Sequence, residues 1–168
     1  MLKVAILTIS DKGSQGFRVD KSGEVIRDTI RQLDSSVVDY DMVPDDKETI
    51  AAKLAEWADR GEIDLILTTG GTGLSERDVT PEATIAVVEK VVPGLAETMR
   101  SKSLEKTPMA MLSRATAGMR KKCLIVNLPG SPKAVKECLE VIIPALPHAI
   151  EIITGEVTEH ETPKAGGI

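Results

Sequence analysis

The chain has 168 residues, with 26 acidic against 21 basic side chains, and 42% of its residues are hydrophobic although only one Phe, one Tyr and one Trp occur. This length suits one domain, and the aliphatic content is sufficient for a packed core. Three rings cannot form the stacking platform that single-stranded nucleic acid requires, and a net charge of −5 creates no field that attracts a phosphate polymer. We therefore expect a globular domain that does not bind nucleic acid.

The cysteines and apolar runs predict a cytoplasmic protein. Cys123 lies in a strand-like apolar run and Cys138 in a helical one, with no C-x-x-C motif. Both are expected as buried thiols in a reducing compartment. All apolar runs are far shorter than the roughly 20 residues that a membrane-spanning helix needs. Because a strand pattern begins at Leu2, we expect neither a signal peptide nor membrane contact.

Strand and helix patterns alternate along the chain. Buried strands are predicted at residues 2–9, 37–43, 64–69 and 123–127. Helices are predicted to start at Ser22, Asp45 and Thr80, and to cover about residues 95–104, 108–115, 133–143 and 148–154. This alternation predicts an α/β fold, a three-layer sandwich with a mostly parallel central sheet. We expect a single domain over residues 1–155, followed by a polar tail over residues 156–168.

Four loops leave the carboxyl ends of the predicted strands, where parallel sheets bind their ligands. They cover residues 10–20, 43–46, 70–80 and 127–132. The unusual residues of the sequence, its clustered glycines, prolines and acidic side chains, are concentrated there. This concentration predicts a functional site at that edge of the sheet.

The third loop begins with a glycine-rich segment, Gly70, Gly71, Thr72 and Gly73. Glycines allow positive φ and let backbone N–H groups approach a ligand closely. The segment fits neither G-x-G-x-x-G nor the P-loop pattern. It is either a tight strand-to-loop turn or a backbone cradle for phosphate or pterin oxygen atoms, and its position after a buried strand favours the cradle.

Two helices begin with a hydroxyl residue followed by proline, Thr80-Pro81 and Ser131-Pro132. This pair is what a helix start prefers, so both hydroxyls can be plain caps. A helix N-terminus also offers unpaired N–H groups and a partial positive charge to an anion. Because both starts lie at the same end of the sheet, anion binding is a second expectation.

Acidic residues stand in the same loops. Asp78 follows the glycine segment, and Asp45 follows Pro44 at the end of the second strand. Where carboxylates and phosphates share a crevice, Mg²⁺ between them takes one or two carboxylates and phosphate oxygens. Alternatively, Asp45 caps a helix, and Asp78 is a turn residue or pairs with Arg77. Asp11, after the first strand, is a weaker candidate.

Basic and histidine residues give weaker signals. Arg114 is either a solvated surface charge or reaches a phosphate or carboxylate in the crevice, and Lys133 is similarly ambiguous. His148 and His160 are isolated, and no His, Cys and carboxylate set has zinc spacing, so a transition-metal site is not expected.

Read together, these loops closely resemble the molybdopterin adenylyltransferase family of molybdenum-cofactor biosynthesis, whose fold also occurs in the G domain of gephyrin. The resemblance extends over nearly the whole chain and rests on four segments, residues 68–73, 77–84, 112–114 and 127–135. It implies a homotrimer that transfers AMP from MgATP to the terminal phosphate of molybdopterin and releases pyrophosphate. Molybdate insertion would follow in a separate protein, to which the product is handed over.

The resemblance also implies roles for individual residues. Asp78 would be the catalytic or Mg²⁺-associated carboxylate, and Asp45 the second essential acid. The pocket around the nucleotide and the pterin would be formed by Ser10, Asp11, Gly70, Gly71, Thr72, Gly73, Thr80, Ser113, Arg114, Pro129, Gly130 and Ser131. Ser131 stands where members often carry Asn or Gln, and its hydroxyl can still cap a helix.

Two other functions compete with adenylyl transfer. The first is a non-catalytic module that binds molybdopterin or acts as a scaffold, although such a binder has no reason to keep both Asp45 and Asp78 beside a phosphate site. The second is nucleotide hydrolysis, for which a P-loop lysine and an obvious water-activating residue are missing. If a pterin binds to this chain, the scarcity of aromatic rings implies that backbone and polar groups hold most of it.

Overall fold

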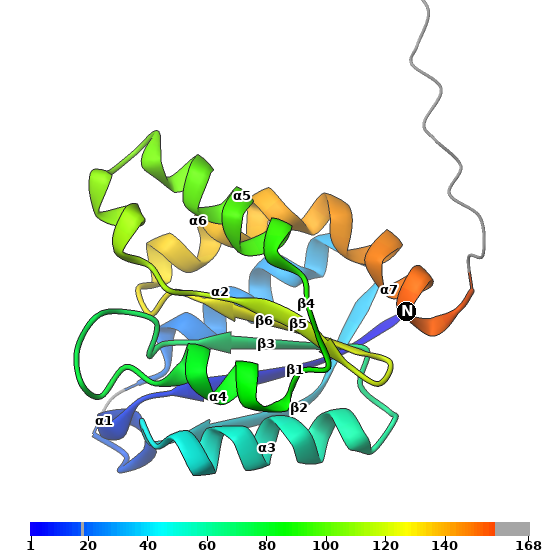
Figure 1. The fold of residues 1–168 in the computed structure, drawn as a ribbon, viewed down its shortest axis with the longest axis horizontal. Helices are drawn as coiled ribbons and strands as arrows, with labels where there is room; N and C mark the ends of the chain where they lie inside the picture. Colours follow the sequence, from blue (N-terminus) through cyan, green and yellow to red (C-terminus); the bar gives the residue numbers. More distant parts are fainter. Residues whose placement is uncertain (18, 157–168) are drawn as a thin grey trace, which may run out of the picture.

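The computed structural model describes residues 1–17 and 19–156, and a single sheet in the order β2-β1-β3-β6-β5-β4 organises them (Figure 1). The strands are β1 Leu2–Ile9, β2 Ser35–Val43, β3 Leu65–Thr69, β4 Lys90–Val91, β5 Ala117–Arg120 and β6 Cys123–Leu128. Strands β2, β1, β3 and β6 are parallel, whereas β5 and β4 add an antiparallel edge. The predicted α/β fold with a mostly parallel sheet is confirmed.

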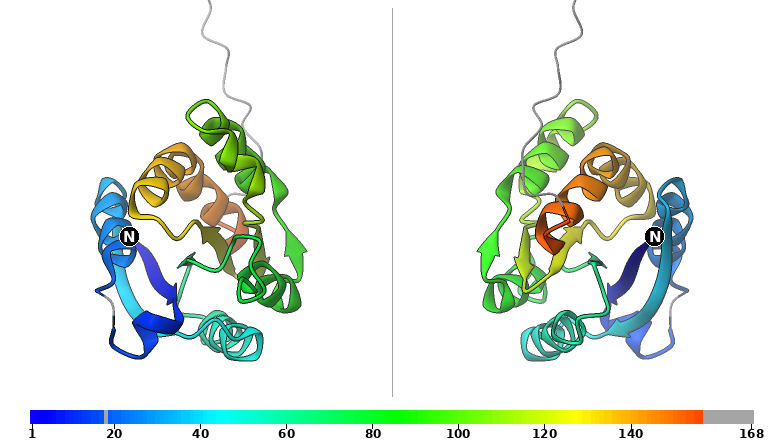
Figure 2. Two further views of the ribbon diagram at one scale, coloured as in Figure 1. Left: turned by 90° about the vertical axis from the view of Figure 1, so that its left-hand side faces the viewer. Right: turned by 90° about the vertical axis from the view of Figure 1, so that its right-hand side faces the viewer.

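Helices lie on both sides of this sheet (Figure 2). The α-helices are α1 Asp11–Ser14, α2 Lys21–Thr29, α3 Lys47–Asp59, α4 Thr80–Val87, α5 Pro93–Leu104, α6 Pro132–Ile142 and α7 Leu146–Thr154. Short 3₁₀ turns are η1 Ile30–Gln32, η2 Pro108–Leu112 and η3 Ile143–Ala145. The segment predicted as a helix over residues 108–115 is thus one of these tighter turns.

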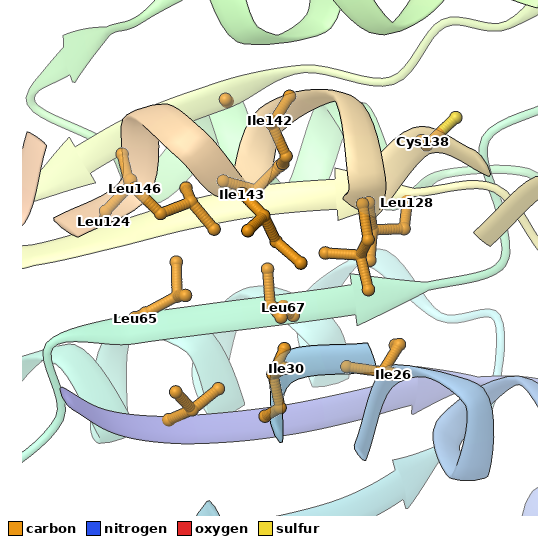
Figure 3. Packing of buried hydrophobic residues seen from close by; sticks show 14 of the residues in the cluster. Ile26, Ile30, Leu65, Leu67, Leu124, Leu128, Cys138, Ile142, Ile143 and Leu146 are labelled. Atoms are coloured by element: carbon orange, nitrogen blue, oxygen red, sulfur yellow. The ribbon is translucent and has the colours of Figure 1, made fainter. Parts of the chain in front are cut away.

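The alternation of side chains along each strand creates two cores. Val4, Leu65 and Leu67 point to one face, where they pack with buried residues of α2, α5, α6 and α7 (Figure 3). Ala5 and Ile66 point to the other face, against α3 and α4. Because every central strand is apolar on both faces, it requires a helical layer on each side. The predicted three-layer sandwich is confirmed.

Several details differ from the sequence-based expectations. Strands β4 and β5 were not predicted, because β4 has two exposed residues and β5 carries Gly118 and no β-branched residue. Helix α2 is capped by Asp20, whose carboxylate accepts from the Gly23 N–H, instead of by Ser22. The predicted tail over residues 156–168 lies outside the described residues, apart from Glu156.

Both cysteines are free and buried, as predicted. Burial raises the pKa of the Cys123 thiol to about 12, which keeps the thiol protonated at neutral pH. Across residues 1–17 and 19–156, no helix has the length and apolarity needed to cross a membrane.

A buried amide connects three elements beneath the loops. Asn127, fully buried near the end of β6, donates to the Thr68 hydroxyl at 3.1 Å and to the Thr84 hydroxyl at 2.9 Å. Its carbonyl oxygen accepts from the Thr116 N–H at 3.2 Å. Because the side chains of Asn127, Thr68 and Thr84 are fully buried, the two threonine hydroxyls cannot take water as a partner in place of the amide.

Replacing Asn127 with Ala is expected to lower the free energy of unfolding by about 2–4 kcal/mol, because buried polar groups lose their partners. Urea denaturation measures this change. The matched control is Thr98→Ala, which removes an exposed hydroxyl bond to the Gly94 carbonyl and should cost less than about 1 kcal/mol. Equal stability of the two variants would contradict the importance of the amide.

Candidate active site

The four parallel strands end at the same edge of the sheet, where a cavity of about 870 Å³ opens. Strand β1 has β2 on one side and β3 on the other, so the order in which successive strands are added to the sheet reverses at this point. Such a switch point leaves a crevice at the carboxyl ends of the strands. The cavity therefore lies where a site was expected, at the carboxyl ends of the strands, and these ends are on the left-hand side of Figure 1.

The structure brings together a subset of the predicted site residues around this cavity. The predicted residues that line it are Ser10, Asp45, Gly70, Gly71, Asp78, Gly130 and Ser131. The sequence analysis did not single out other lining residues, including Thr8, Phe17, Asp20, Lys21 and Met42. Two of these, Phe17 and Asp20, follow β1 in the predicted loop over residues 10–20, but no pattern in that loop marked the individual side chains.

A second cavity of about 300 Å³ borders the second half of the glycine segment, Thr72 and Gly73, whereas Gly70 and Gly71 line the larger cavity. It is lined by four more predicted residues, Thr72, Gly73, Ser113 and Pro129. Residues of α5, η2 and α6 complete it, among them Met99, Leu112 and Cys138. The predicted site residues are thus divided between two cavities that share the glycine segment as a wall.

The glycine segment could not carry side chains at its first two positions. Gly70 has a φ of +96°, and a Cβ there would collide with the Ile9 carbonyl oxygen of β1. Gly71 has a φ of +69°, and a Cβ there would collide with the Thr80 hydroxyl and lie 3.2 Å from a carboxylate oxygen of Asp45. A Cβ on Gly73 would lie 2.8 Å from a carboxylate oxygen of Asp78. The glycines therefore bring the backbone against both carboxylates.

Hydrogen bonds fix this backbone from several directions. The Thr80 hydroxyl donates to the Gly70 carbonyl at 2.9 Å, and the Thr69 hydroxyl donates to the Pro129 carbonyl at 2.7 Å. The Ser22 hydroxyl of α2 donates to the Gly130 carbonyl at 2.7 Å. The loops after β3 and β6 are therefore held at a fixed distance before any ligand arrives.

Asp45 and Asp11 hold each other across the ends of β2 and β1. The Asp45 N–H donates to Asp11 at 2.9 Å, and the Asp11 N–H donates to Asp45 at 3.0 Å. Arg77 binds Asp11 through two nitrogens, at 2.8 and 3.0 Å, and this hydrogen bonding lowers the pKa of Asp11. Asp11 thus positions Asp45 and does not line the cavity.

The charge of Asp45 is disfavoured by its surroundings. Burial raises the pKa of Asp45, the Asp11 N–H partly offsets this effect, and the nearby carboxylates of Asp11 and Asp78 raise the pKa further. The expected helix cap at Asp45 is wrong, because Asp46 caps α3 by accepting from the Thr49 N–H at 2.9 Å. Because Asp45 does not cap α3, its carboxylate is available to the cavity that it lines. A cation bound there would reduce the electrostatic repulsion between the carboxylates of Asp45 and Asp78.

Asp78 accepts from the Ser75 N–H at 2.9 Å and also lines the cavity. Arg77 pairs with Asp11, so the alternative of an Arg77–Asp78 pair is wrong. The other alternative, that Asp78 is a turn residue, is confirmed, because the hydrogen bond from the Ser75 N–H to its carboxylate closes the turn. The turn directs the carboxylate toward the glycine segment.

Arg114 and Thr80 stabilise the site from outside both cavities. Arg114 donates to the Gly73 carbonyl at 2.8 Å and the Asp78 carbonyl at 2.7 Å, and it forms an ion pair with Glu82. Thr80 is fully buried and forms the first residue of α4, so its expected role as N-cap is wrong and Val79 takes that position. Both residues fix the glycine segment without reaching the cavity wall.

An anion and a divalent cation both fit this arrangement. Ser131 caps α6 by accepting from the Ala134 N–H at 3.2 Å, as predicted, so the start of that helix borders the cavity. Within the described residues, no three His, Cys, Asp or Glu side chains gather as a metal cluster. Mg²⁺ needs only one or two protein carboxylates when phosphates supply the other oxygens, and Asp45 and Asp78 can provide them.

Comparison with known proteins places the chain in a family. The sequence pattern described as a probable molybdopterin binding domain matches residues 5–148. The chain belongs to this family. A molybdopterin adenylyltransferase of Helicobacter pylori J99 is 42% identical over 156 residues, which cover 92% of this chain and 89% of that protein. The resemblance drawn from the motifs is confirmed.

Other members of the molybdopterin-binding family share the fold and the length of the chain. The molybdopterin biosynthesis enzyme MoaB of Thermus thermophilus superposes with a TM-score of 0.87 at 52% identity, over 92% of this chain and 98% of that one. A molybdopterin adenylyltransferase of Escherichia coli K12 is 36% identical over 172 residues, 94% of this chain and 88% of that protein.

Replacing Gly70 with Ala is expected to lower the free energy of unfolding by about 3 kcal/mol or more. The new side chain would be strained by the positive φ, and its Cβ would also collide with the Ile9 carbonyl oxygen. Gly61→Ala is the matched control: Gly61 has a φ of +73° but no atom within 4 Å of an added Cβ, and its cost should be about 1 kcal/mol. Urea denaturation compares the two. Equal losses would show that Gly70 does not approach β1 closely.

Replacing Asp45 with Asn is expected to stabilise the chain at neutral pH, because the native fold raises the pKa of Asp45 and thus disfavours its charge. Below the unfolded pKa, near 3.8, both states are protonated and the two proteins should be about equally stable. The advantage of the variant should grow as the pH rises through the folded pKa, and then level off. Thermal melts of both proteins from pH 3.5 to 7.5 measure it, and a variant that is less stable at every pH would contradict the electrostatic explanation.

Proposed function

We propose that this chain is a molybdopterin adenylyltransferase, a nucleotidyltransferase of molybdenum-cofactor biosynthesis that joins AMP from ATP to the terminal phosphate of molybdopterin and releases pyrophosphate. The observation that carries the proposal is the placement of Asp45 and Asp78 against one glycine segment in one cavity. A module that only binds molybdopterin has no use for two carboxylates beside a phosphate cradle, since they repel the anion. A transferase that uses a divalent cation does.

The reaction brings two polyanions together, so its barrier is mainly electrostatic. The attacking phosphate oxygen is already ionised at pH 7, and no strong general base is needed. The Gly70 N–H already donates to the Leu128 carbonyl, so the N–H groups of residues 71–73 and the start of α6 are the ones that can stabilise the charge on the α-phosphate. Their hydrogen-bonded support from Thr80 and Ser22 means that little reorganisation is needed during transfer.

Mg²⁺ would be held by Asp78 and Asp45 together with phosphate oxygens, and it would supply charge neutralisation. Asp78 acts as a metal ligand or orients one, and it does not act as a proton acceptor. The raised pKa of Asp45 agrees with a site that is short of positive charge until a cation enters.

Two cavities that are both lined by residues of the glycine segment suit a reaction with two substrates. Each cavity would hold the non-reacting part of one substrate, and the phosphates would meet over the glycine segment that forms their common wall. We also infer from the family resemblance that the active protein is a cytoplasmic homotrimer, whose product passes to a molybdate-inserting enzyme.

The test is incubation of the chain with molybdopterin, ATP and Mg²⁺. We expect AMP-molybdopterin and an equal amount of pyrophosphate, and Asp78→Asn should lower the turnover rate about 10³-fold, because the metal loses an anionic ligand. Molybdopterin binding should remain nearly unchanged, because the isosteric amide keeps the hydrogen bond to Ser75. The matched control is Glu76→Gln, which removes an exposed carboxylate outside both cavities.

Two outcomes would contradict the proposal. Tight binding of molybdopterin by the native chain without product would favour the non-catalytic module. Loss of both turnover and molybdopterin binding in Asp78→Asn, with Glu76→Gln unaffected, would contradict the metal-associated role of Asp78.

A further inference from the structure

One aromatic ring stands uncovered at the wall of the larger cavity. Phe17 is 78% exposed and Val19 is 69% exposed, and both line that cavity. The other two aromatic side chains of the chain are elsewhere, since Trp57 lies on α3 and is buried in the core, and Tyr40 lies on β2 outside the cavity wall. Exposing a phenyl ring to water is unfavourable, so an uncovered ring at a binding cavity indicates a contact made in the bound state.

The backbone that carries Phe17 is held although its ring is free. Its N–H donates to the Lys12 carbonyl at 2.9 Å, and the N–H of Gly16 donates to the Gly13 carbonyl at 3.0 Å. Ser10 caps the preceding helix α1 by accepting from the Gly13 N–H at 3.0 Å. The ring is therefore presented from a fixed turn, which lowers the entropy lost when a ligand covers it.

The far end of the same loop is fixed as well. Asp20 accepts from the hydroxyls of Thr8 and Tyr40, both at 2.6 Å, and from the Gly23 N–H at 2.9 Å. These bonds anchor the loop to β1, β2 and α2 at once. Phe17 and Val19 thus line the same cavity as the glycine segment and Asp78.

We infer that Phe17 packs its ring against the planar heterocycle of a substrate whose phosphate lies at the glycine segment, and that it determines the preference for heterocyclic over simple phosphate ligands. The inference rests on the proposed function and adds a residue to it. Two substrates carry such a heterocycle, the adenine of ATP and the pterin of molybdopterin. Stacking on an aromatic face depends little on the identity of the ring, so either fits this chemistry.

The experiment measures equilibrium binding by calorimetry with Mg²⁺ present, using ATP, inorganic triphosphate and molybdopterin as three separate ligands. The variants are Phe17→Ala, Phe17→Leu and Phe17→Trp, and the matched control is Ile152→Ala, which truncates a 41% exposed apolar side chain on α7. Sedimentation records the assembly state of each protein. We expect Phe17→Ala to weaken one heterocyclic ligand about tenfold, with triphosphate unchanged.

The other variants refine the expected pattern. Phe17→Leu should recover part of the loss and Phe17→Trp all of it, because the contact depends on a flat apolar face. Loss confined to ATP identifies adenine as the stacked ring, and loss confined to molybdopterin identifies the pterin. Ile152→Ala should bind all three ligands like the native chain.

Three results would overturn the inference. In Phe17→Ala, the affinity for both heterocyclic ligands could be unchanged, or the affinity for triphosphate could fall as much as theirs. The third is a change of assembly state with ligand binding intact, which would make Phe17 an interface residue. These results are distinct from a failure of the proposed function. A native chain that binds its heterocyclic ligands through Phe17 but forms no AMP-molybdopterin would contradict the transferase and support the role of Phe17.

Discussion

The close approach of the Gly70 backbone to the Ile9 carbonyl is the constraint on which the site depends. It presses the loop after β3 onto the end of β1, at the point where the sheet reverses its order. Because no side chain intervenes, the segment that follows passes directly beside Asp45 and Asp78. Residues of the same segment line both cavities, Gly70 and Gly71 the larger one and Thr72 and Gly73 the smaller one. A bulkier residue at this position would displace both carboxylates and both cavities together.

The support of the site is more extensive than the site itself. Arg114 holds the carbonyls of Gly73 and Asp78, Asp11 holds Asp45, and Asn127 lies beneath them in the core. None of these three side chains lines the larger cavity. Such preorganisation is what an electrostatic mechanism requires, because donors that are already fixed need not reorganise as charge moves. The proposed mechanism uses fixed backbone donors and a cation to bind phosphate, which agrees with a net charge of −5.

Periodicity and loop position were sufficient to predict the layers and the edge of the sheet that carries the site. Apolar strands such as residues 64–69 are recognisable because both their faces are buried. Side-chain partners could not be predicted, because they depend on long-range packing. Asp45 has the sequence context of a cap, but Asp46 takes that role, and Arg77 pairs with Asp11, 66 positions away, instead of with its neighbour. No local sequence pattern marked Phe17, and only its position on the cavity wall indicates a role in binding.

The central claim is that substrate phosphates meet at the glycine segment, between its backbone N–H groups and the two carboxylates. A crystal structure of the chain with Mg²⁺ and α,β-methylene ATP tests it most directly. We predict the α-phosphate within hydrogen-bond distance of backbone N–H groups of residues 71–73, with the metal bound to Asp78, Asp45 or both. A nucleotide whose phosphates lie away from this segment, with neither carboxylate near the metal, would contradict the account.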